Sequence, residues 1–378
     1  MRLCIGIVAA MSAQFSPPRR RPGALKRLVG PLVKPDVFDF WSTRLHRTWT
    51  WDRPMARLVA REAASADAVT LLLRPNRHWA GHRAGQHVNL GVEIGGVRVT
   101  RSYSLTAPPR ADGLLPVTVK AIEGGRVSNH LCREARLGEV FELGQAFGDM
   151  TLPEAPTDAP RLLLAAGSGI TPMIALAREL AARGMPGETT LLYWVRRREE
   201  ACFLDELRAL AAAHPRFRFR LLLTRQAAAS PDEGEGRIDA ASLEDSLAGP
   251  AQMHAMACGP GGFVEAARAL LAGRVAAFQA EAFTLPPRAV AEDGEVEVRL
   301  QRSGRTLRLA RGLSLLEALE AQGLKPDSGC RMGICNSCAC GKAGGSVRHL
   351  PSGELAHEPT QALKLCIHSA ATDLELDL

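Results

Sequence analysis

The stretch DSGCRMGICNSCACG, residues 327–341, holds four of the nine cysteines in this 378-residue chain. Cys330, Cys335 and Cys338 follow the spacing C-x4-C-x2-C, and Cys366 follows after a gap of 27 residues. This spacing is typical of the plant-type 2Fe-2S cluster, in which a loop supplies three thiolates and a distant cysteine supplies the fourth. Zinc sites more often space their ligands as C-x2-C pairs, so a zinc site is the alternative.

A cluster of this kind needs a loop around the cysteines, because three thiolates must converge while backbone N–H groups point at the sulfur atoms. Gly329 and Gly333 leave the backbone free to wrap closely. Cys340 lies two residues beyond Cys338 and outside the pattern. We predict that Cys340 is a free thiol, buried or half-exposed.

The length and composition favour a reduced globular protein of two or three domains. Hydrophobic residues make up 46% of the chain and charged residues 23%, and no run of eighteen apolar residues predicts a membrane span. The first residues, MRLCIGIVAAM, are short for a signal peptide, and Met11 is an alternative start. An odd number of cysteines without a clear export signal predicts free thiols and a cytoplasmic location.

The net charge of +7 lies in residues 1–54, which hold ten Lys and Arg against three Asp and Glu. The rest of the chain holds 37 of each sign. A neutral body argues against nucleic-acid binding as the main function. The basic, aromatic-rich head suits either packing on another domain, which we prefer, or peripheral contact with the inner face of a membrane.

The pattern of apolar residues changes twice along the chain. Short strands with Gly and Pro turns predict an antiparallel barrel, and alternating strands and helices then predict a parallel sheet. A Pro-rich, charged segment follows, and then period-two strands and a short helix lead into the cysteine loop. The predicted segments are a basic extension (1–54), a β-barrel (55–155), an α/β domain (156–284), a linker (285–294) and an α+β domain (295–378).

Two motifs of the barrel suit a cofactor that carries phosphate. In RSYSL, residues 101–105, Arg101 offers a fork of donors, Tyr103 a flat ring and Ser104 a hydroxyl group. In EGGRVSNHL, residues 123–131, two glycines precede a helix start whose free N–H groups suit an anion.

Two motifs of the α/β domain stand at strand ends. LLLAAGSGITPM, residues 162–173, runs from a strand into a helix, with Thr171 as the predicted N-cap and Pro172 at the first helical position. It does not match the G-x-G-x-x-G fingerprint. MACGPGGF, residues 256–263, places Cys258 at the end of a later strand, where a buried core thiol is the alternative interpretation.

These four motifs and the cysteine pattern occur in the order found in the ferredoxin-NADP reductase superfamily. Residues 55–378 resemble in particular the iron-sulfur flavoprotein reductases with a plant-type ferredoxin domain at the C-terminus. The resemblance implies a multidomain fold with an antiparallel β-barrel that binds the flavin, an α/β parallel-sheet nucleotide domain and an α+β β-grasp ferredoxin domain.

The resemblance also implies roles for single residues. Arg101 would lie near phosphate and Ser104 near the reactive flavin nitrogen, and the turn before the helix at residue 127 would bind a diphosphate, which favours FAD over FMN. Cys258 would lie beside the nicotinamide, and Glu281 matches a family carboxylate near the flavin edge. The predicted catalytic residues are Ser104, Cys258 and Glu281. The predicted cofactor-binding residues are Arg101, Tyr103, Ser104, Gly125, Val127, Ser128, Gly167, Gly169, Thr171, Pro172, Arg196, Arg197, Arg225, Cys258, Gly259 and Pro260. The predicted cluster ligands are Cys330, Cys335, Cys338 and Cys366.

The choice of dinucleotide depends on arginines at two strand ends. Arg196, Arg197 and Arg198 follow one strand and Arg225 follows the next, without an acidic residue where a partner for a 2′-hydroxyl is expected. A 2′-phosphate would explain these charges, so we prefer NADPH and keep NADH as possible. A solvated run of charges is the alternative.

Three histidines, His78, His82 and His87, have metal-like spacing. Gly81, Gly85 and the alternating residues that follow indicate a turn entering a strand rather than a helix. We therefore predict no metal site here.

The predicted reaction passes electrons from NADPH through FAD and the 2Fe-2S cluster to an external acceptor. A flavin is needed because nicotinamide delivers two electrons as hydride, whereas the cluster accepts one at a time. Residues 295–378 hold ten basic and ten acidic residues, so we expect a tethered domain that moves on its linker rather than one steered by charge.

The chain shows no recognised oxygenase site, so we predict the reductase component of a larger system. Family members with a similar N-terminal extension resemble partners of membrane-bound fatty-acid desaturases, and we prefer that acceptor. A soluble ring-hydroxylating or haem monooxygenase is the alternative. A redox sensor without enzymatic activity and a zinc-bearing adaptor are the remaining alternatives from other classes.

Overall fold

The computed structural model describes residues 34–155, 157–247, 252–284 and 294–378. The chain divides into two compact units, Met1–Asp52 and Arg53–Leu378. Residues 1–33 of the basic extension, including Met11, and nearly all of the predicted linker lie outside the described residues.

The described part of the first unit is built on α2 (Pro35–Leu45). Pro35 begins the helix, where its missing N–H costs no hydrogen bond. Asp39 accepts a hydrogen bond from the backbone N–H of Trp51 at 2.5 Å. Large apolar side chains of this unit are exposed, namely Val37, Phe40, Trp41, Leu45 and Trp49. None of the described helices of the chain has the length and apolar character needed to cross a membrane.

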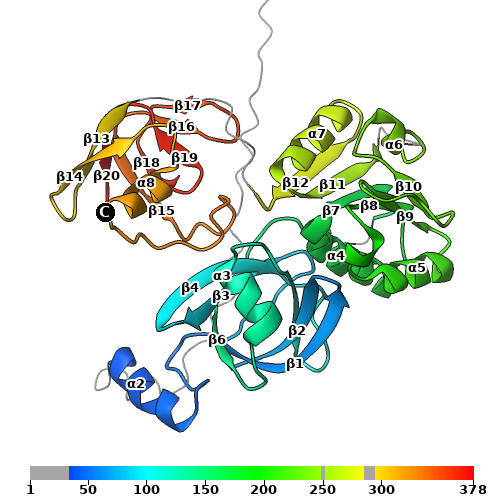
Figure 1. The fold of residues 1–378 in the computed structure, drawn as a ribbon, viewed down its shortest axis with the longest axis horizontal. Coiled ribbons are helices and arrows are strands. Elements are labelled where there is room, and N and C mark those ends of the chain that lie inside the picture. Colours follow the sequence, from blue (N-terminus) through cyan, green and yellow to red (C-terminus); the bar gives the residue numbers. More distant parts are fainter. Residues whose placement is uncertain (1–33, 156, 248–251, 285–293) are drawn as a thin grey trace, which may run out of the picture. The chain divides into compact units, whose positions relative to one another are not determined.

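The second unit begins with a six-stranded sheet in the order β4-β3-β6-β1-β2-β5, in which all neighbours are antiparallel. Its strands are β1 (Met55–Ser65), β2 (Ala68–Pro75), β3 (His87–Ile94), β4 (Val97–Ser104), β5 (Leu115–Lys120) and β6 (Val140–Leu143). A bridge between Leu105 and Val117 joins the end of β4 to β5, so the sheet closes into the predicted barrel (Figure 1). The helical turn α3 (Arg126–Asn129) follows β5.

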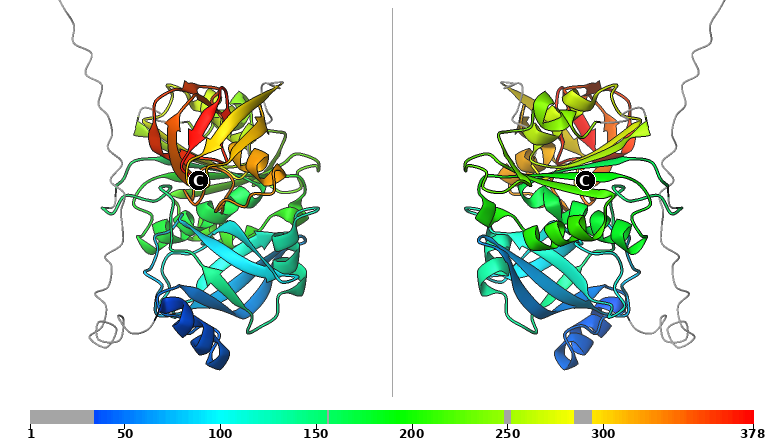
Figure 2. Two further views of the ribbon diagram at one scale, coloured as in Figure 1. Left: turned by 90° about the vertical axis from the view of Figure 1, so that its left-hand side faces the viewer. Right: turned by 90° about the vertical axis from the view of Figure 1, so that its right-hand side faces the viewer.

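The middle of the unit is a parallel sheet in the order β10-β9-β8-β7-β11-β12. Its strands are β7 (Arg161–Ala166), β8 (Thr189–Val195), β9 (Phe217–Leu223), β10 (Glu233–Glu235), β11 (His254–Gly259) and β12 (Ala277–Ala282). Helices α4 (Ile170–Ala182) and α5 (Leu204–Ala213) pack on one face, and α6 (Ala240–Glu244) and α7 (Gly261–Leu271) on the other (Figures 1 and 2). This is the α/β fold predicted from the alternating pattern.

The strand order places a functional position at the boundary between β7 and β11. The chain runs outward from β7 to β8, β9 and β10, and then returns to place β11 on the other side of β7. In open parallel sheets, ligands bind at such a reversal, beyond the carboxyl ends of the strands. The GSG turn follows β7 and the CGP segment ends β11, so both motifs lie at this boundary.

The C-terminal part contains a five-stranded sheet, in the order β14-β13-β20-β15-β18, and a three-stranded sheet, β17-β16-β19. The strands are β13 (Glu295–Leu300), β14 (Thr306–Ala310), β15 (Ala339–Gly344), β16 (Val347–His349), β17 (Leu355–Ala356), β18 (Thr360–Lys364), β19 (His368–Ala370) and β20 (Leu374–Leu376). The helix α8 (Leu315–Ala321) starts at a capping box of Ser314 and Glu317, and the cysteine loop runs from α8 to β15.

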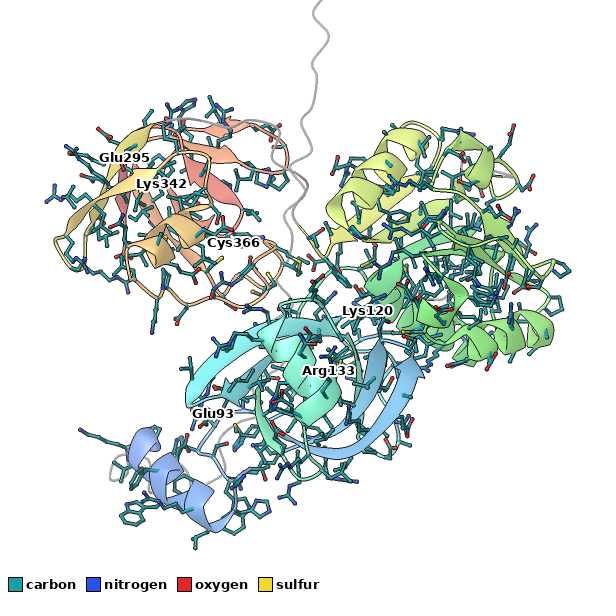
Figure 3. The ribbon with its side chains drawn as sticks, viewed as in Figure 1. Glu93, Lys120, Arg133, Glu295, Lys342 and Cys366 are labelled. Carbon is teal, nitrogen blue, oxygen red and sulfur yellow. The ribbon has the colours of Figure 1, made fainter. Side chains whose placement is uncertain are left out.

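A buried lysine stabilises this domain (Figure 3). Lys342 on β15 is 2% exposed, and its ammonium group donates to the backbone oxygens of Gly345 at 2.6 Å and His357 at 2.9 Å. The paired carbonyl groups offset the cost of removing the charge from water. Cys340, on the same strand, is buried in the hydrophobic core, and burial raises the pKa of its thiol to about 12.

Candidate functional site

A cavity of 1070 Å³ lies against β4 and the start of α3. Its wall also includes residues from the GSG turn, from the ends of β11 and β12, and from the loop before and within the cysteine motif. The volume is at the upper end of the range for small-molecule sites, as a large cofactor requires. The predicted site residues in its wall are Arg101, Tyr103, Ser104, Gly125, Val127, Ser128, Thr171, Pro260 and Cys330. Those outside its wall are Gly167, Gly169, Pro172, Arg196, Arg197, Arg225, Cys258, Gly259, Glu281, Cys335, Cys338 and Cys366.

The part of the cavity near α3 fits a phosphate-bearing cofactor. The hydroxyl of Ser128 is buried and has no hydrogen-bond partner among the described residues, so a ligand could supply one. A Cβ at Gly125 would lie 2.4 Å from this hydroxyl, which explains the glycine. Burial lowers the pKa of Arg101, and the neighbouring charges of Arg331 and Arg126 lower it further. Arg101, Arg126 and Arg331 all lie in the cavity wall, and Arg331 is already paired with Glu320, so an anion would chiefly relieve the repulsion between Arg101 and Arg126.

The turn between β7 and α4 packs directly against β11. A Cβ at Gly169 would lie 1.9 Å from the backbone oxygen of Cys258, so only glycine allows this approach. Gly169 is also the observed N-cap of α4. The prediction that Thr171 is the N-cap and Pro172 the first helical residue is therefore wrong, because the 3-10 turn Gly167–Gly169 leads directly into a helix that begins at Ile170.

Thr171 has a different role in the structure. Its hydroxyl donates to the Ser104 hydroxyl at 3.0 Å and lies 2.9 Å from the backbone oxygen of Ser168. The first of these bonds links the barrel strand β4 to the helix that begins the nucleotide domain. It fixes the Ser104 oxygen, which faces the cavity.

A buried pair lies on the same side of the cavity. Nε2 of His87 and Oε2 of Glu281 are 3.1 Å apart, with side chains 3% and 10% exposed. Their geometry does not form a hydrogen bond, so both atoms are without a hydrogen-bond partner within the described chain. Burial lowers the pKa of His87 to about 4 and raises that of Glu281 to about 8. Both groups are therefore neutral at pH 7.

His87 is a site residue that sequence reasoning missed. It begins β3, as the predicted turn into a strand requires, and it pairs with Ser104 across β3 and β4. His87 lines the cavity, whereas Glu281 does not, so Glu281 reaches the cavity through the imidazole. Cys258 is fully buried opposite Glu281 in the β11–β12 register, and burial raises the pKa of its thiol. The sequence analysis considered His87 only for its metal-like spacing, which does not indicate this role.

The four predicted cluster ligands come together in the structure. These thiols shift one another's pKa. The interaction with Cys335 lowers the pKa of the Cys330 thiol, whereas the interactions with Cys330 raise those of Cys335 and Cys366. In a cluster, cationic irons would take the place of the thiol protons.

Backbone donors surround these sulfur atoms, as predicted. The N–H groups of Met332 and Ile334 lie 3.3 Å from Sγ of Cys330, and that of Gly333 lies 3.2 Å from Sγ of Cys366. Gly333 has a φ of 77°, which favours glycine. Such donors stabilise the negative charge of a cluster.

A single metal ion and a two-iron cluster need different arrangements of their ligands. Across the described ranges, no three His, Cys, Asp or Glu side chains converge as the ligands of one metal ion do. A 2Fe-2S cluster instead divides its four thiolates between two irons. Cys330 interacts with both Cys335 and Cys366, and Cys338 interacts with Cys366, so the four thiols form one connected group.

The cysteine loop contacts the barrel next to the cavity. The side-chain amide of Asn89 donates to the Ser337 hydroxyl at 3.2 Å, and the Ser102 hydroxyl bonds to the same side chain. A Cβ at Gly329 would lie 2.9 Å from Nδ2 of Asn89. The loop therefore approaches β3 closely, and Cys330 lies in the wall of the cavity.

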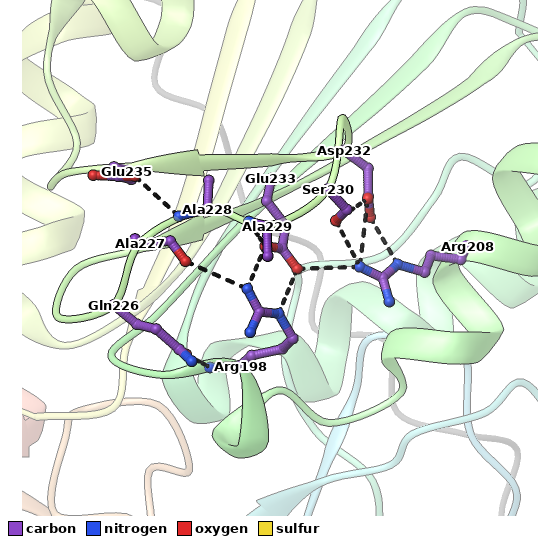
Figure 4. Close-up of polar contacts among 10 residues, drawn as sticks. All are labelled: Arg198, Arg208, Gln226, Ala227, Ala228, Ala229, Ser230, Asp232, Glu233 and Glu235. Carbon is purple, nitrogen blue, oxygen red and sulfur yellow. Dashed lines mark hydrogen bonds and ion pairs between the residues drawn. The ribbon is translucent and has the colours of Figure 1, made fainter.

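The structure also shows acidic partners for three of the four arginines at the strand ends. Arg196 pairs with Glu200 at 2.9 Å, and Arg197 lies 3.8 Å from Glu199. Arg198 makes two bonds to Glu233, at 2.6 and 2.5 Å, and so holds the loop after β9 in place (Figure 4). Arg225 is exposed and has no carboxylate partner among the described residues. The sequence analysis overlooked these carboxylates.

Comparisons with known proteins agree with the three domains. Family models match at residues 55–151 (oxidoreductase FAD-binding domain), 163–269 (oxidoreductase NAD-binding domain) and 298–368 (2Fe-2S iron-sulfur cluster binding domain). An NADPH oxidoreductase of Mycobacterium tuberculosis is 31% identical over 95% of this chain and 94% of its own. Phenoxybenzoate dioxygenase subunit beta of Ectopseudomonas oleovorans is 32% identical over 86% and 98%. The solved structure of phthalate dioxygenase reductase superposes with a TM-score of 0.60 at 23% identity, covering 86% of this chain and 97% of that one.

Proposed function

Because this chain belongs to the iron-sulfur flavoprotein reductases of the ferredoxin-NADP reductase superfamily, we propose that it is the reductase component that supplies electrons to an oxygenase. It is an NAD(P)H-dependent enzyme with FAD and a 2Fe-2S cluster. The observation that carries the proposal is that one cavity has both the RSYSL strand and Cys330 of the cluster loop in its wall. A flavin in this cavity would lie between the nucleotide domain and the cluster.

When bound, FAD converts the two-electron donation of the nicotinamide into single-electron steps to the cluster. We assign the binding of its phosphates to Arg101, Gly125, Val127 and Ser128. The hydroxyl of Ser104, held by Thr171, would orient the reactive edge of the ring.

In this proposal, the end of β11 admits the nicotinamide. Gly259 leaves no room for a side chain, because a Cβ there would lie 2.9 Å from the Cβ of Ala166. Cys258 is fully buried, so its thiol would exclude water from this part of the site.

For the donor, we propose NADPH in preference to NADH. Arg196, Arg197 and Arg225 follow the carboxyl ends of β8 and β9, where an arginine can accept the 2′-phosphate. Arg225 supports this assignment best, because its charge has no carboxylate partner within the described chain.

For the acceptor, the comparisons favour the alternative of the sequence analysis. Two of the three proteins compared above carry the name of a dioxygenase component, and none is named for a fatty-acid desaturase. We therefore propose an oxygenase. The membrane contact of residues 1–54 stays a prediction, supported by the exposed aromatic side chains Phe40, Trp41 and Trp49.

The visible spectrum of anaerobically purified protein, before and after equimolar NADPH or NADH, tests the electron path. We expect flavin bands over a broad cluster absorbance, both bleached, and faster with NADPH. The variant Cys338→Ser should lose cluster absorbance and transfer to an acceptor, while its flavin is still bleached. A colourless protein that ignores both nucleotides after cofactor reconstitution would contradict the proposal.

A sedimentation experiment with anionic vesicles separates the two acceptors. Binding to vesicles that is lost when residues 1–54 are deleted would favour the desaturase. Turnover of a ring-hydroxylating oxygenase by the deleted form, at the rate of the full chain, would support the proposed acceptor.

A further inference from the structure

Glu200 lies at the meeting point of the nucleotide domain and the barrel. It ends the turn that follows β8, and its side chain is 13% exposed. Its Oε2 accepts hydrogen bonds from Nε of Arg196 at 3.0 Å and from Nη2 at 2.9 Å. The same oxygen accepts from Nζ of Lys120, at the end of β5, at 2.9 Å. One carboxylate oxygen therefore holds two cations from two domains.

Other contacts fix this arrangement in place. Lys120 also pairs with Asp67 at 2.9 Å, and the backbone N–H of Ala66 donates to the oxygen of Glu199 at 3.0 Å. Burial opposes ionisation of Glu200, but the hydrogen bonds from Lys120 and Arg196 lower its pKa below the ordinary value. Glu200 is therefore a fixed negative charge beyond the carboxyl end of β8.

Arg196 and Arg225, at the ends of neighbouring strands, differ in whether a carboxylate binds them. The backbone N–H of Arg225 donates to the oxygen of Arg196 at 3.0 Å, so the ends of β8 and β9 lie together. Arg225 is exposed and without a carboxylate partner in the described ranges, whereas Arg196 is bound by Glu200. A 2′-phosphate at the ends of β8 and β9 could therefore bind Arg225 directly, whereas Arg196 is already paired.

We propose that Glu200 is a specificity-determining residue that weakens the preference for a 2′-phosphorylated dinucleotide by competing for Arg196. To bind Arg196, the phosphate must displace a carboxylate of the same sign of charge. This inference rests on the proposed function, because it concerns the nucleotide site of that function.

The bond to Lys120 explains why Glu200 weakens the binding of a 2′-phosphate to Arg196 but does not prevent it. When Arg196 turns to a phosphate, Glu200 keeps its bond to Lys120 and is not left as an unpaired, half-buried charge. The displacement therefore costs little. The chain should accept both dinucleotides, with a moderate preference for the phosphorylated one.

The test measures the binding of two ligands that differ only in the 2′-phosphate, adenosine 2′,5′-bisphosphate and 5′-AMP, to the holoenzyme by calorimetry. The variant Glu200→Gln keeps an acceptor oxygen for Lys120 and removes the charge. We expect the ratio of the two affinities to rise about tenfold toward the bisphosphate, as for one opposing charge removed from a partly exposed site. The double variant Glu200→Gln with Arg196→Gln should show no gain over Arg196→Gln alone.

The control variant is Glu199→Gln, which makes the same change of charge one residue earlier. Glu199 is exposed and lies 3.8 Å from Arg197, so its removal should change the ratio less than twofold. An equal rise in both variants would overturn the proposal, because it would show an effect of net charge alone. An unchanged or lower ratio in Glu200→Gln would also overturn it.

A second variant, Glu200→Asp, protects the test against loss of folding. It keeps the charge but shortens the side chain, and an intermediate ratio is expected with unchanged flavin absorbance. A ratio equal to that of the parent would count against the proposal. If the parent protein binds neither ligand, the proposed function fails. If it binds both and only the variants show no change, this inference alone fails.

Discussion

The two edge strands of the parallel sheet each carry a glutamate with little exposure, in opposite electrostatic surroundings. Glu233, on β10, is 1% exposed at its side chain and faces Arg198 and Arg208. Glu281, on β12, is 10% exposed and faces His87, which is neutral at pH 7. The hydrogen bonds from Arg198 lower the pKa of Glu233 to about 2, whereas burial raises that of Glu281 to about 8.

The difference distinguishes a glutamate with a structural role, Glu233, from one beside the functional site, Glu281. The carboxylate of Glu233 is fully compensated, and its bonds close the loop that follows β9 (Figure 4). The carboxyl group of Glu281 has no compensating cation among the described residues and lies behind a histidine of the cofactor cavity. A titratable group kept in such surroundings marks a functional site more often than a structural one.

The largest expected effect is the loss of stability in Glu233→Gln. The variant leaves two arginines facing a neutral amide, and breaking a buried pair at one partner is strongly destabilising. We expect the melting temperature to fall by on the order of 5 °C. Glu188→Gln is the control, because its pair with Arg218 is exposed and should contribute little. Equal melting temperatures for both variants would contradict the structural role of Glu233.

Glu281→Gln should have the opposite effect, which grows as the pH rises from about 4.5 to about 8. The pKa of Glu281 is raised from 4.5 in the unfolded chain to about 8 in the folded one, so the native state binds the proton more tightly. The stability from this group is complete below about pH 4.5 and is lost as the pH rises to about 8. Gln cannot ionise, so the variant should melt higher than the parent above pH 8 and equally at pH 4.5. Melting curves of the holoprotein between pH 4 and 9 would check this, and a variant that melts lower throughout would contradict it.

His87→Gln should change the acid side of the same profile by a smaller amount. The pKa of His87 falls from 6.5 to about 4 on folding, so its contribution is present above pH 6.5 and is lost as the pH falls to 4. The groups that face this pair are Asp149, Cys258 and Cys330, in addition to the two partners themselves. The variant should lose less stability than the parent between pH 6.5 and 4, measured in the same series. A parallel shift of both curves would show that His87 remains charged when buried.

The sequence was sufficient for the features that depend on local spacing. The cysteine pattern predicted a loop with backbone donors at the sulfur atoms, and the alternating patterns predicted the barrel and the parallel sheet, all of which the structure shows. These features follow from residues close together in the chain or from regular periodicity.

The sequence was insufficient where distant residues meet. His87 and Glu281 are almost two hundred positions apart, and no spacing rule connects them or reports their burial. The predicted N-cap of α4 was wrong because the turn Gly167–Gly169 already coils as a 3-10 helix and continues directly into α4. Arg198 looked like its neighbours Arg196 and Arg197 in the sequence, but only the fold shows that it binds Glu233.

The smallest expected change in stability belongs to Arg197→Gln, which completes the comparison. Arg197 and its partner Glu199 are 62% and 57% exposed and 3.8 Å apart, a pair that adds little to stability. We expect the melting temperature to change by about 1 °C or less. Because we propose that Arg197 contributes to binding a 2′-phosphate, the affinity for adenosine 2′,5′-bisphosphate should still fall about threefold, with 5′-AMP unaffected. Arg198→Gln should behave in the reverse way, since its side chain holds the loop after β9. If Arg197→Gln changed stability and left both affinities unaltered, then exposure would not separate binding charges from structural charges at this edge of the sheet.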